Sequence, residues 1–91
     1  IKSCLDSLFM QGHKDIETIV VDNGSGDGTV NLIKDKYPRA IFIENKKNLG
    51  ACRARNQGVE ASRGDWVLFL DCDVILEKGF LSQAVKMFKT I

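Results

Sequence analysis

Two aspartates separated by one residue follow an apolar run in the last third of the chain. Asp71 and Asp73 come directly after the segment 66–70. Mg²⁺ and Mn²⁺ prefer oxygen ligands, and Mg²⁺ is commonly held by one or two carboxylates together with substrate phosphates. The spacing therefore suits a site at which a cation neutralises the charge of a departing diphosphate. A polar turn after a strand is the structural alternative.

A second acidic segment follows another apolar run, at 16–21. It reads Asp22-Asn23-Gly24-Ser25. An acidic side chain at this place can accept hydrogen bonds from a base or a ribose, and glycine allows the backbone to approach a ligand closely. The alternative is a strand-to-helix turn in which Asp27 caps the next helix.

Asn48, Gly50 and Arg55 form a third group, at the start of an expected helix whose N-cap is Asn48. The forked guanidinium of arginine matches pairs of phosphate oxygens, so Arg55 is a candidate for ligand contact. It can equally pair with a carboxylate such as Asp71 or Asp22 and order the loops.

Alternating helices and strands must position these groups. Strands that alternate with helices predict an α/β fold, here three layers (α/β/α) around a mainly parallel sheet. Ligands bind outside the carboxyl ends of such strands, so we expect both acidic segments to contribute to one site. The expected helices are 1–11, 28–36, 49–62 and 78–90, and the expected strands are 16–21, 40–44 and 66–70.

Bulk properties narrow the function further. A chain of 91 residues is one domain at most, and a net charge of +1 gives no electrostatic footprint for nucleic acid. No apolar run approaches the roughly 20 residues of a membrane helix. The three cysteines are odd in number and lack zinc-ligand spacing, so we expect reduced thiols in the cytoplasm.

The ordered motifs resemble those of family 2 glycosyltransferases, whose fold is the nucleotide-diphospho-sugar transferase (GT-A) fold. The resemblance covers nearly the whole chain, and four motifs in this order are more specific than any one alone. They are Ile19-Val20-Val21-Asp22-Asn23-Gly24-Ser25, Asn48-Leu49-Gly50, Ala54-Arg55-Asn56-Gln57-Gly58 and Leu68-Phe69-Leu70-Asp71-Cys72-Asp73.

The resemblance implies roles for the matching residues. Asp22 would contact the base or ribose, Asp71 the ribose or the metal, and Asp73 the Mn²⁺ or Mg²⁺ on the diphosphate. The segment 48–50 would lie beside the nucleotide. The candidate nucleotide-sugar-binding residues are Asp22, Asn23, Asn48, Gly50, Arg55 and Asp71, and the candidate metal ligands are Asp73 and Asp71.

Departures from the family pattern define a further expectation. The family begins with a strand that would precede residue 1 and lie between 16–21 and 66–70, and its second half supplies the acceptor site and the catalytic base. Residues 1–91 are therefore expected to be an interior fragment: the nucleotide-sugar-binding, Rossmann-like half of a GT-A domain, inactive alone. Either 16–21 and 66–70 pair directly, or the exposed sheet edge recruits a second chain as a homodimer.

The expected function is metal-dependent, inverting sugar transfer from a UDP- or GDP-sugar to an undefined acceptor. The expected location is the cytoplasm or the cytoplasmic face of a membrane, because family members often use lipid-linked or polysaccharide acceptors. Three alternatives stay open. The first is a haloacid dehalogenase-type phosphatase with Asp71 as nucleophile. The second is a dinucleotide-binding domain at Gly24-x-Gly26-x-Gly28, whose last interval is one residue shorter than the usual spacing. The third is a non-catalytic α/β module.

Overall fold

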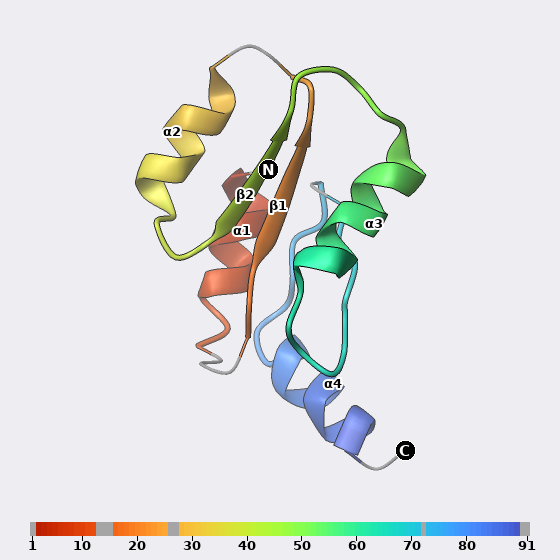
Figure 1. Ribbon diagram of the computed structural model, residues 1–91. Coiled ribbons are helices and arrows are strands. Elements are labelled where there is room, and N and C mark those ends of the chain that lie inside the picture. The colour runs from red at the N-terminus through yellow and green to blue at the C-terminus, as the bar shows by residue number, and fades with distance from the viewer. Residues whose placement is uncertain (1, 13–15, 26–27, 72, 90–91) are drawn as a thin grey trace. The chain divides into compact units, whose positions relative to one another are not determined.

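The computed structural model describes residues 2–12, 16–25, 28–71 and 73–89. The chain divides into two compact units, which we treat separately (Figure 1). One comprises Ile1–Ile16 with Leu70–Ile91, and the other comprises Glu17–Phe69.

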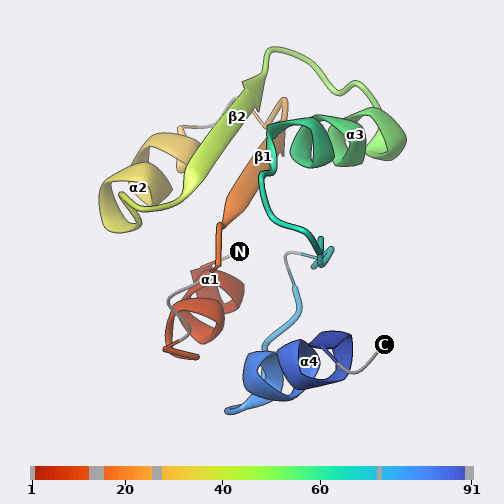
Figure 2. The same cartoon turned by 60° about the horizontal axis from the view of Figure 1, so that its bottom comes forward.

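A parallel strand pair forms the centre of the unit Glu17–Phe69. Strand β1 (Ile19–Asn23) pairs with β2 (Ile41–Asn45), in a register that runs from Ile19 opposite Ile41 to Asn23 opposite Asn45. Helix α2 (Thr29–Lys36) connects the two strands, and α3 (Ala51–Ala61) follows β2. Figures 1 and 2 both show α2 and α3 on opposite sides of the strand pair, so this unit has the expected three α/β/α layers.

The two faces of the strand pair meet different helices, because side chains alternate along a strand and registered neighbours share a face. On the α3 face, a Cβ built at Gly58 would lie 3.8 Å from Cγ2 of Val21. Gly58 therefore faces Val21 of β1 at a distance at which a methyl group would make ordinary van der Waals contact. On the other face, Lys34 of α2 pairs with Glu44 and lies 6.0 Å from the centre of the Phe42 ring.

Strand β1 begins and ends later than the sequence predicts. The expected strand at 16–21 leaves Asp22 and Asn23 in a loop, whereas the structure includes both in the parallel ladder, opposite Glu44 and Asn45. Polar residues can continue a ladder at its end because only the backbone must pair. The shift places both side chains at defined positions on opposite faces of the sheet.

The caps of α2 and α3 also differ from expectation. The N-cap of α3 is Gly50, not Asn48, and it makes no side-chain cap bond. Asn48 lies two residues earlier, where its Oδ1 accepts a hydrogen bond of 2.8 Å from the N–H of Gly50. The N-cap of α2 is Gly28, with φ of 80°; the expected cap, Asp27, lies outside the described residues.

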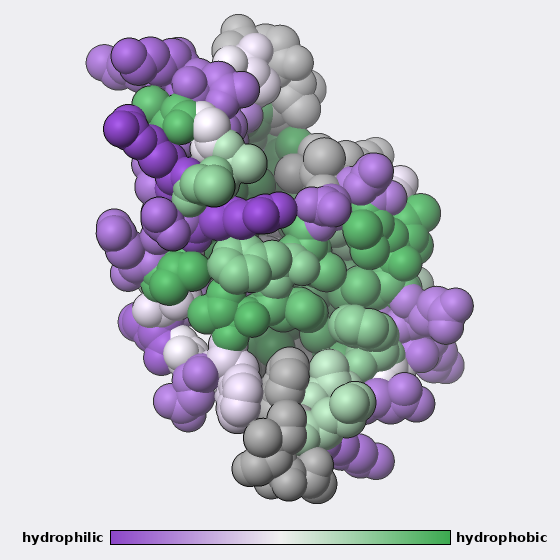
Figure 3. All heavy atoms as spheres, turned by 90° about the vertical axis from the view of Figure 1, so that its right-hand side faces the viewer, coloured by the Kyte–Doolittle hydropathy of each residue, from purple (hydrophilic) through white to green (hydrophobic). Residues whose placement is uncertain are grey.

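The prediction of a third strand at 66–70 is wrong. The segment is not a strand, and within the described residues β1 pairs with β2 alone. A strand needs a neighbour to complete its hydrogen bonds, and 66–70 has none among these residues. The expected direct pairing with 16–21 is therefore not observed. Trp66 and Phe69 are more than half exposed, and apolar side chains are visible at the surface in Figure 3.

The other unit contains α1 (Lys2–Phe9) and α4 (Phe80–Lys89). Ser7 is its buried polar link: its Oγ donates to the carbonyl of Cys4 at 2.8 Å and accepts from the N–H of Leu76 at 3.0 Å. Gln11 adds bonds to the carbonyl of Glu77 and the N–H of Leu81. These bonds attach the end of α1 to the chain around the start of α4.

The thiols and helix lengths bear on two further expectations. Cys4 carries a buried thiol and Cys52 an exposed thiol, whereas Cys72 lies outside the described residues. Across the part of the chain that the structure describes, no helix has the length and apolar character needed to cross a membrane.

Candidate functional site

Asp22 lies at an open hollow beside the carboxyl end of the strand pair. Its Oδ1 accepts a hydrogen bond of 2.6 Å from Oγ of Ser25, which fixes one carboxylate oxygen and leaves acceptor capacity on the other. The hollow has a volume of about 390 Å³ and is lined by Asp22, Ser25, Gly28, Val30, Asn31, Glu44, Asn45 and Lys46. Hydrogen-bond acceptors and a cationic side chain therefore line this space.

Asn23 connects the end of β1 to the loop before α3. Its Nδ2 donates to Oδ1 of Asn48 at 2.9 Å, and its Oδ1 accepts from the N–H of Leu49 at 2.8 Å. Two candidate residues that are 25 positions apart in the sequence thus lie in direct contact. The sequence placed them beside the same ligand but did not predict that they bond to each other.

Two glycines shape the backbone around this contact. Gly24 has φ of 84°, and a Cβ built on it would lie 2.7 Å from the carbonyl carbon of Lys47 and 2.9 Å from the backbone nitrogen of Asn48. Only glycine permits this close approach between the end of β1 and the loop. Gly50 has φ of 89° with open space around it, so a backbone turn, rather than crowding, selects glycine there.

Arg55 lies beside an aromatic ring. Its guanidinium carbon is 6.0 Å from the centre of the Phe69 ring, at the outer limit of a cation–π contact. Within the described residues of this unit, no ion pair joins Arg55 to Asp22, whose carboxylate instead accepts from Ser25. The alternative in which Arg55 orders the loop by pairing with Asp22 is therefore not observed.

Asp71 and Asp73 belong to the other unit. The carbonyl of Asp71 accepts bonds from Sγ of Cys4 at 3.7 Å and from the N–H of Val74 at 3.1 Å. Both residues are exposed, while Cys72 between them lies outside the described residues. That this pair and Asp22 share one ligand stays a prediction.

The candidate metal ligands can be compared with the ligands that a divalent cation needs. Within the described ranges, no group of three or more histidine, cysteine or acidic residues converges. Two exposed carboxylates are nevertheless the usual protein contribution to a Mg²⁺ that phosphates also coordinate. Asp71 and Asp73 therefore fit a metal brought with a diphosphate better than a metal held by protein alone.

Sequence reasoning missed two polar residues that support the site. Asn45 and Gln57 pair reciprocally: each amide nitrogen donates to the other residue's carbonyl oxygen at 2.8 Å. Asn45 Nδ2 also lies 3.3 Å from Oδ1 of Asn23. An asparagine at the end of an apolar strand was the available signal for Asn45, whereas only the fold brings Gln57 to it.

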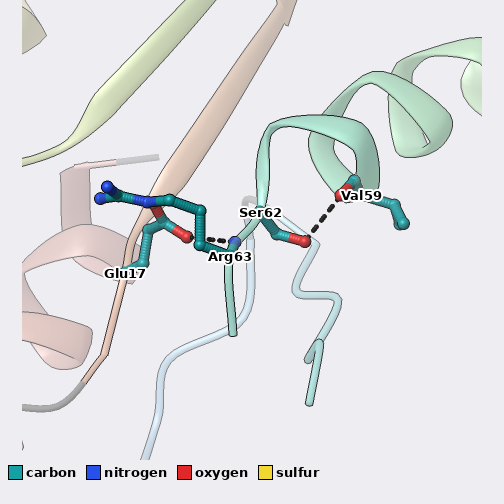
Figure 4. Close-up of polar contacts among 4 residues, drawn as sticks. All are labelled: Glu17, Val59, Ser62 and Arg63. Atoms are coloured by element: carbon teal, nitrogen blue, oxygen red, sulfur yellow. Dashed lines mark hydrogen bonds and ion pairs between the residues drawn. The ribbon is translucent and has the colours of Figure 1, made fainter. Parts of the chain in front are cut away.

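A contact at the opposite end of β1 was also missed (Figure 4). Glu17 accepts from the backbone N–H of Arg63 at 2.9 Å and from its Nε at 3.1 Å. The backbone hydrogen bond, assisted by the guanidinium, lowers the pKa of the Glu17 carboxyl, although partial desolvation acts in the opposite direction. Nearby, Oγ of Ser62 donates to the carbonyl of Val59 and closes the end of α3.

Parallel strands between helices, with acidic and amide side chains at their carboxyl ends, are typical of α/β domains that bind nucleotides. The sequence comparisons specify the class. The model of the glycosyl transferase family 2 matches residues 1–91, and the chain belongs to this family. The α/β architecture agrees with part of the fold that the motif resemblance implies.

Three relatives illustrate the range of the match. Glycosyltransferase GlyA of Streptococcus pneumoniae is 34% identical over 89 residues, covering 94% of this chain and 13% of the relative. Uncharacterized glycosyltransferase YibD of Escherichia coli is 35% identical over 75 residues, covering 79% and 22%. Uncharacterized glycosyltransferase MJ1057 of Methanocaldococcus jannaschii is 37% identical over 89 residues, covering 88% and 31%.

The chain spans less than a third of the length of each of these relatives. No solved structure gives a significant match. The family match does not favour the phosphatase alternative, which relies on the Asp71 motif alone.

Proposed function

We propose that the chain is the donor-binding part of a glycosyltransferase that moves a sugar from a nucleotide-diphospho-sugar to an acceptor. Residues 1–91 would bind the nucleotide and the metal, and the catalytic base would come from outside these residues. The family match supports the reaction class. The donor belongs to the UDP- or GDP-sugar class, and the transfer inverts the anomeric centre.

One observation carries the proposal most directly: Asp22 and Asn23 end a parallel strand, and Asn23 is held against the Asn48–Gly50 loop. Asp22 faces a hollow with a free acceptor oxygen, and the Asn23 amide is oriented by two hydrogen bonds. A nucleoside offers ribose hydroxyls and base N–H groups as donors, which the second carboxylate oxygen of Asp22 can accept. The hollow, at about 390 Å³, is within the size range of small-molecule sites.

A divalent cation fits the remaining candidate residues. Asp73 and Asp71 would hold Mn²⁺ or Mg²⁺ together with the diphosphate oxygens of the donor. When bound, the cation would neutralise negative charge on the leaving diphosphate. Each of the two carboxylates would contribute to the affinity for the cation. Both side chains are exposed and therefore accessible to the cation.

We further propose that the protein acts in the cytoplasm or at the cytoplasmic face of a membrane. Nucleotide-sugar donors would be met there, and the thiols of Cys4 and Cys52 are compatible with a reducing compartment. Fractionation of cells that express the full-length protein would test this location.

Metal-dependent nucleotide binding tests the proposed function. We expect UDP or GDP, titrated calorimetrically into the full-length protein, to bind more tightly with Mn²⁺ than with EDTA. Asp73→Asn should remove most of this metal-dependent gain, of roughly tenfold or more, because it replaces a charged oxygen ligand with a neutral one.

The control variant is Asp65→Asn, which removes an exposed acidic charge outside the candidate motifs. It should bind nucleotide and metal as the unchanged protein does. Absence of nucleotide binding in the unchanged protein would contradict the proposal. Hydrolysis of a simple phosphoester, abolished by Asp71→Asn, would instead support the phosphatase.

A further inference from the structure

A chain of amide side chains runs from α3 through both strands to the loop before α3. It comprises Gln57, Asn45, Asn23 and Asn48, which we call the amide network. Gln57 and Asn45 exchange two hydrogen bonds of 2.8 Å. Asn45 then donates to Asn23 at 3.3 Å, and Asn23 donates to Asn48 at 2.9 Å.

The backbone of the loop is attached to the same network. The N–H of Leu49 donates to Asn23, and the N–H of Gly50 donates to Asn48, each at 2.8 Å. These two groups precede the first turn of α3, where backbone N–H groups lack partners within the helix. The network therefore fixes both the side chains and the backbone of segment 48–50.

Each amide in the network has a definite orientation. Asn45 uses its nitrogen for both Asn23 and Gln57, and its oxygen accepts only from Gln57. Rotating any one amide by half a turn would exchange its nitrogen and oxygen. A donor would then face a donor, or an acceptor would face an acceptor. The orientation of Asn23, which is a candidate nucleotide-sugar-binding residue, is therefore linked through Asn45 to Gln57 of α3.

We propose that Gln57 and Asn45 are positioning residues, which hold Asn23, Asn48 and the 48–50 backbone in the geometry that binds the nucleotide. This inference rests on the proposed function. Asn45 is also one of the residues that line the hollow beside Asp22. Gln57 itself need not contact the ligand.

Three variants of the full-length protein test the proposal, with UDP and Mn²⁺ as the probe. Gln57→Leu keeps the approximate side-chain size and removes both bonds to Asn45. It should weaken UDP binding about five- to tenfold, the effect of about one lost hydrogen bond of net value 1 kcal/mol. Gln57→Glu keeps an acceptor for Asn45 Nδ2 but sets a carboxylate oxygen against Asn45 Oδ1, and should weaken binding at least as much.

The exchange Asn45→Gln with Gln57→Asn preserves the total length and the reciprocal amide pair. It should restore UDP affinity to within about twofold, a small fraction of the effect expected for one hydrogen bond. The matched control is Ser62→Ala, which removes a hydrogen bond of 2.7 Å at the other end of α3. It should lower the thermal midpoint without changing UDP affinity.

The outcomes separate this inference from the proposed function. If the unchanged protein binds no UDP or GDP, the proposed function fails and the inference fails with it. If the unchanged protein binds UDP and folded Gln57→Leu binds equally well, the inference alone is overturned. If Gln57→Leu does not fold, Gln57→Glu decides the question by the same comparison of affinity with thermal midpoint.

Discussion

Gly24 shows how one residue can be required by its surroundings. Its φ of 84° is accessible to glycine at little cost, and the adjoining loop backbone leaves no room for a side chain. Gly28 has a similar φ of 80°, but nothing lies within 4 Å of the place where its Cβ would be. The two positions share one backbone requirement and differ in steric crowding.

We expect Gly24→Ala to lower the free energy of unfolding by about 2–4 kcal/mol, because it adds a backbone clash to the cost of positive φ. Gly28→Ala should cost about 1 kcal/mol, from the positive φ alone. Urea denaturation of both variants measures the difference. Equal losses would show that the loop backbone moves aside without cost and that the close approach at Gly24 is not required.

At the scale of elements, Glu17 joins the chain before β1 to the chain after α3. The backbone N–H of Arg63 is its main stabilising partner, and the resulting pKa lies below the ordinary value of 4.5. A carboxyl whose pKa is lowered by folding adds stability above its ordinary pKa and loses that contribution as the pH falls through the folded value. The effect therefore belongs to a window that begins near pH 4.5 and extends downward.

We expect Glu17→Gln to reduce stability at neutral pH and to flatten the dependence of stability on pH below 4.5, since the variant cannot titrate there. Urea midpoints measured across this window for both proteins provide the test. Glu60→Gln, which changes an exposed acid on α3, is the matched control. Parallel pH curves for Glu17→Gln and the unchanged protein would contradict the assignment.

Most elements could be predicted because their signals are local. The helices and the first two strands follow from apolar spacing and from breakers such as Pro38 and Gly64, with shifts of up to three residues at their ends. The segment 66–70 could not be predicted in the same way. Its apolar residues favour a strand, but strand formation depends on a partner elsewhere in the sequence.

At the scale of the whole molecule, an open strand edge and an exposed apolar segment of the unit Glu17–Phe69 favour association. Within the described residues, the outer edge of β1 has no strand beside it. The segment 66–69 exposes four apolar side chains, from 43% at Val67 to 57% at Trp66. Open strand edges and exposed apolar segments are common sites of contact between chains.

We expect copies of this 91-residue chain to form dimers through these features, with a sedimentation coefficient that rises with concentration. Leu68→Lys should shift the equilibrium toward monomer, because charge on an exposed strand-like segment opposes pairing. Val59→Lys, at an exposed apolar residue of α3, provides the control and should leave association unchanged. A monomeric mass at all concentrations would contradict the proposed homodimer.

The sequence by itself determined the family, the α/β class and the candidate residues, because motif order and apolar periodicity are properties of the chain. Tertiary structure decided that Asp22 and Asn23 continue β1, that Gly24 meets the loop backbone and that Gln57 orients Asn45. It also decided that 66–70 is not a strand. These outcomes depend on hydrogen bonds and contacts between residues distant in sequence, which local patterns do not encode.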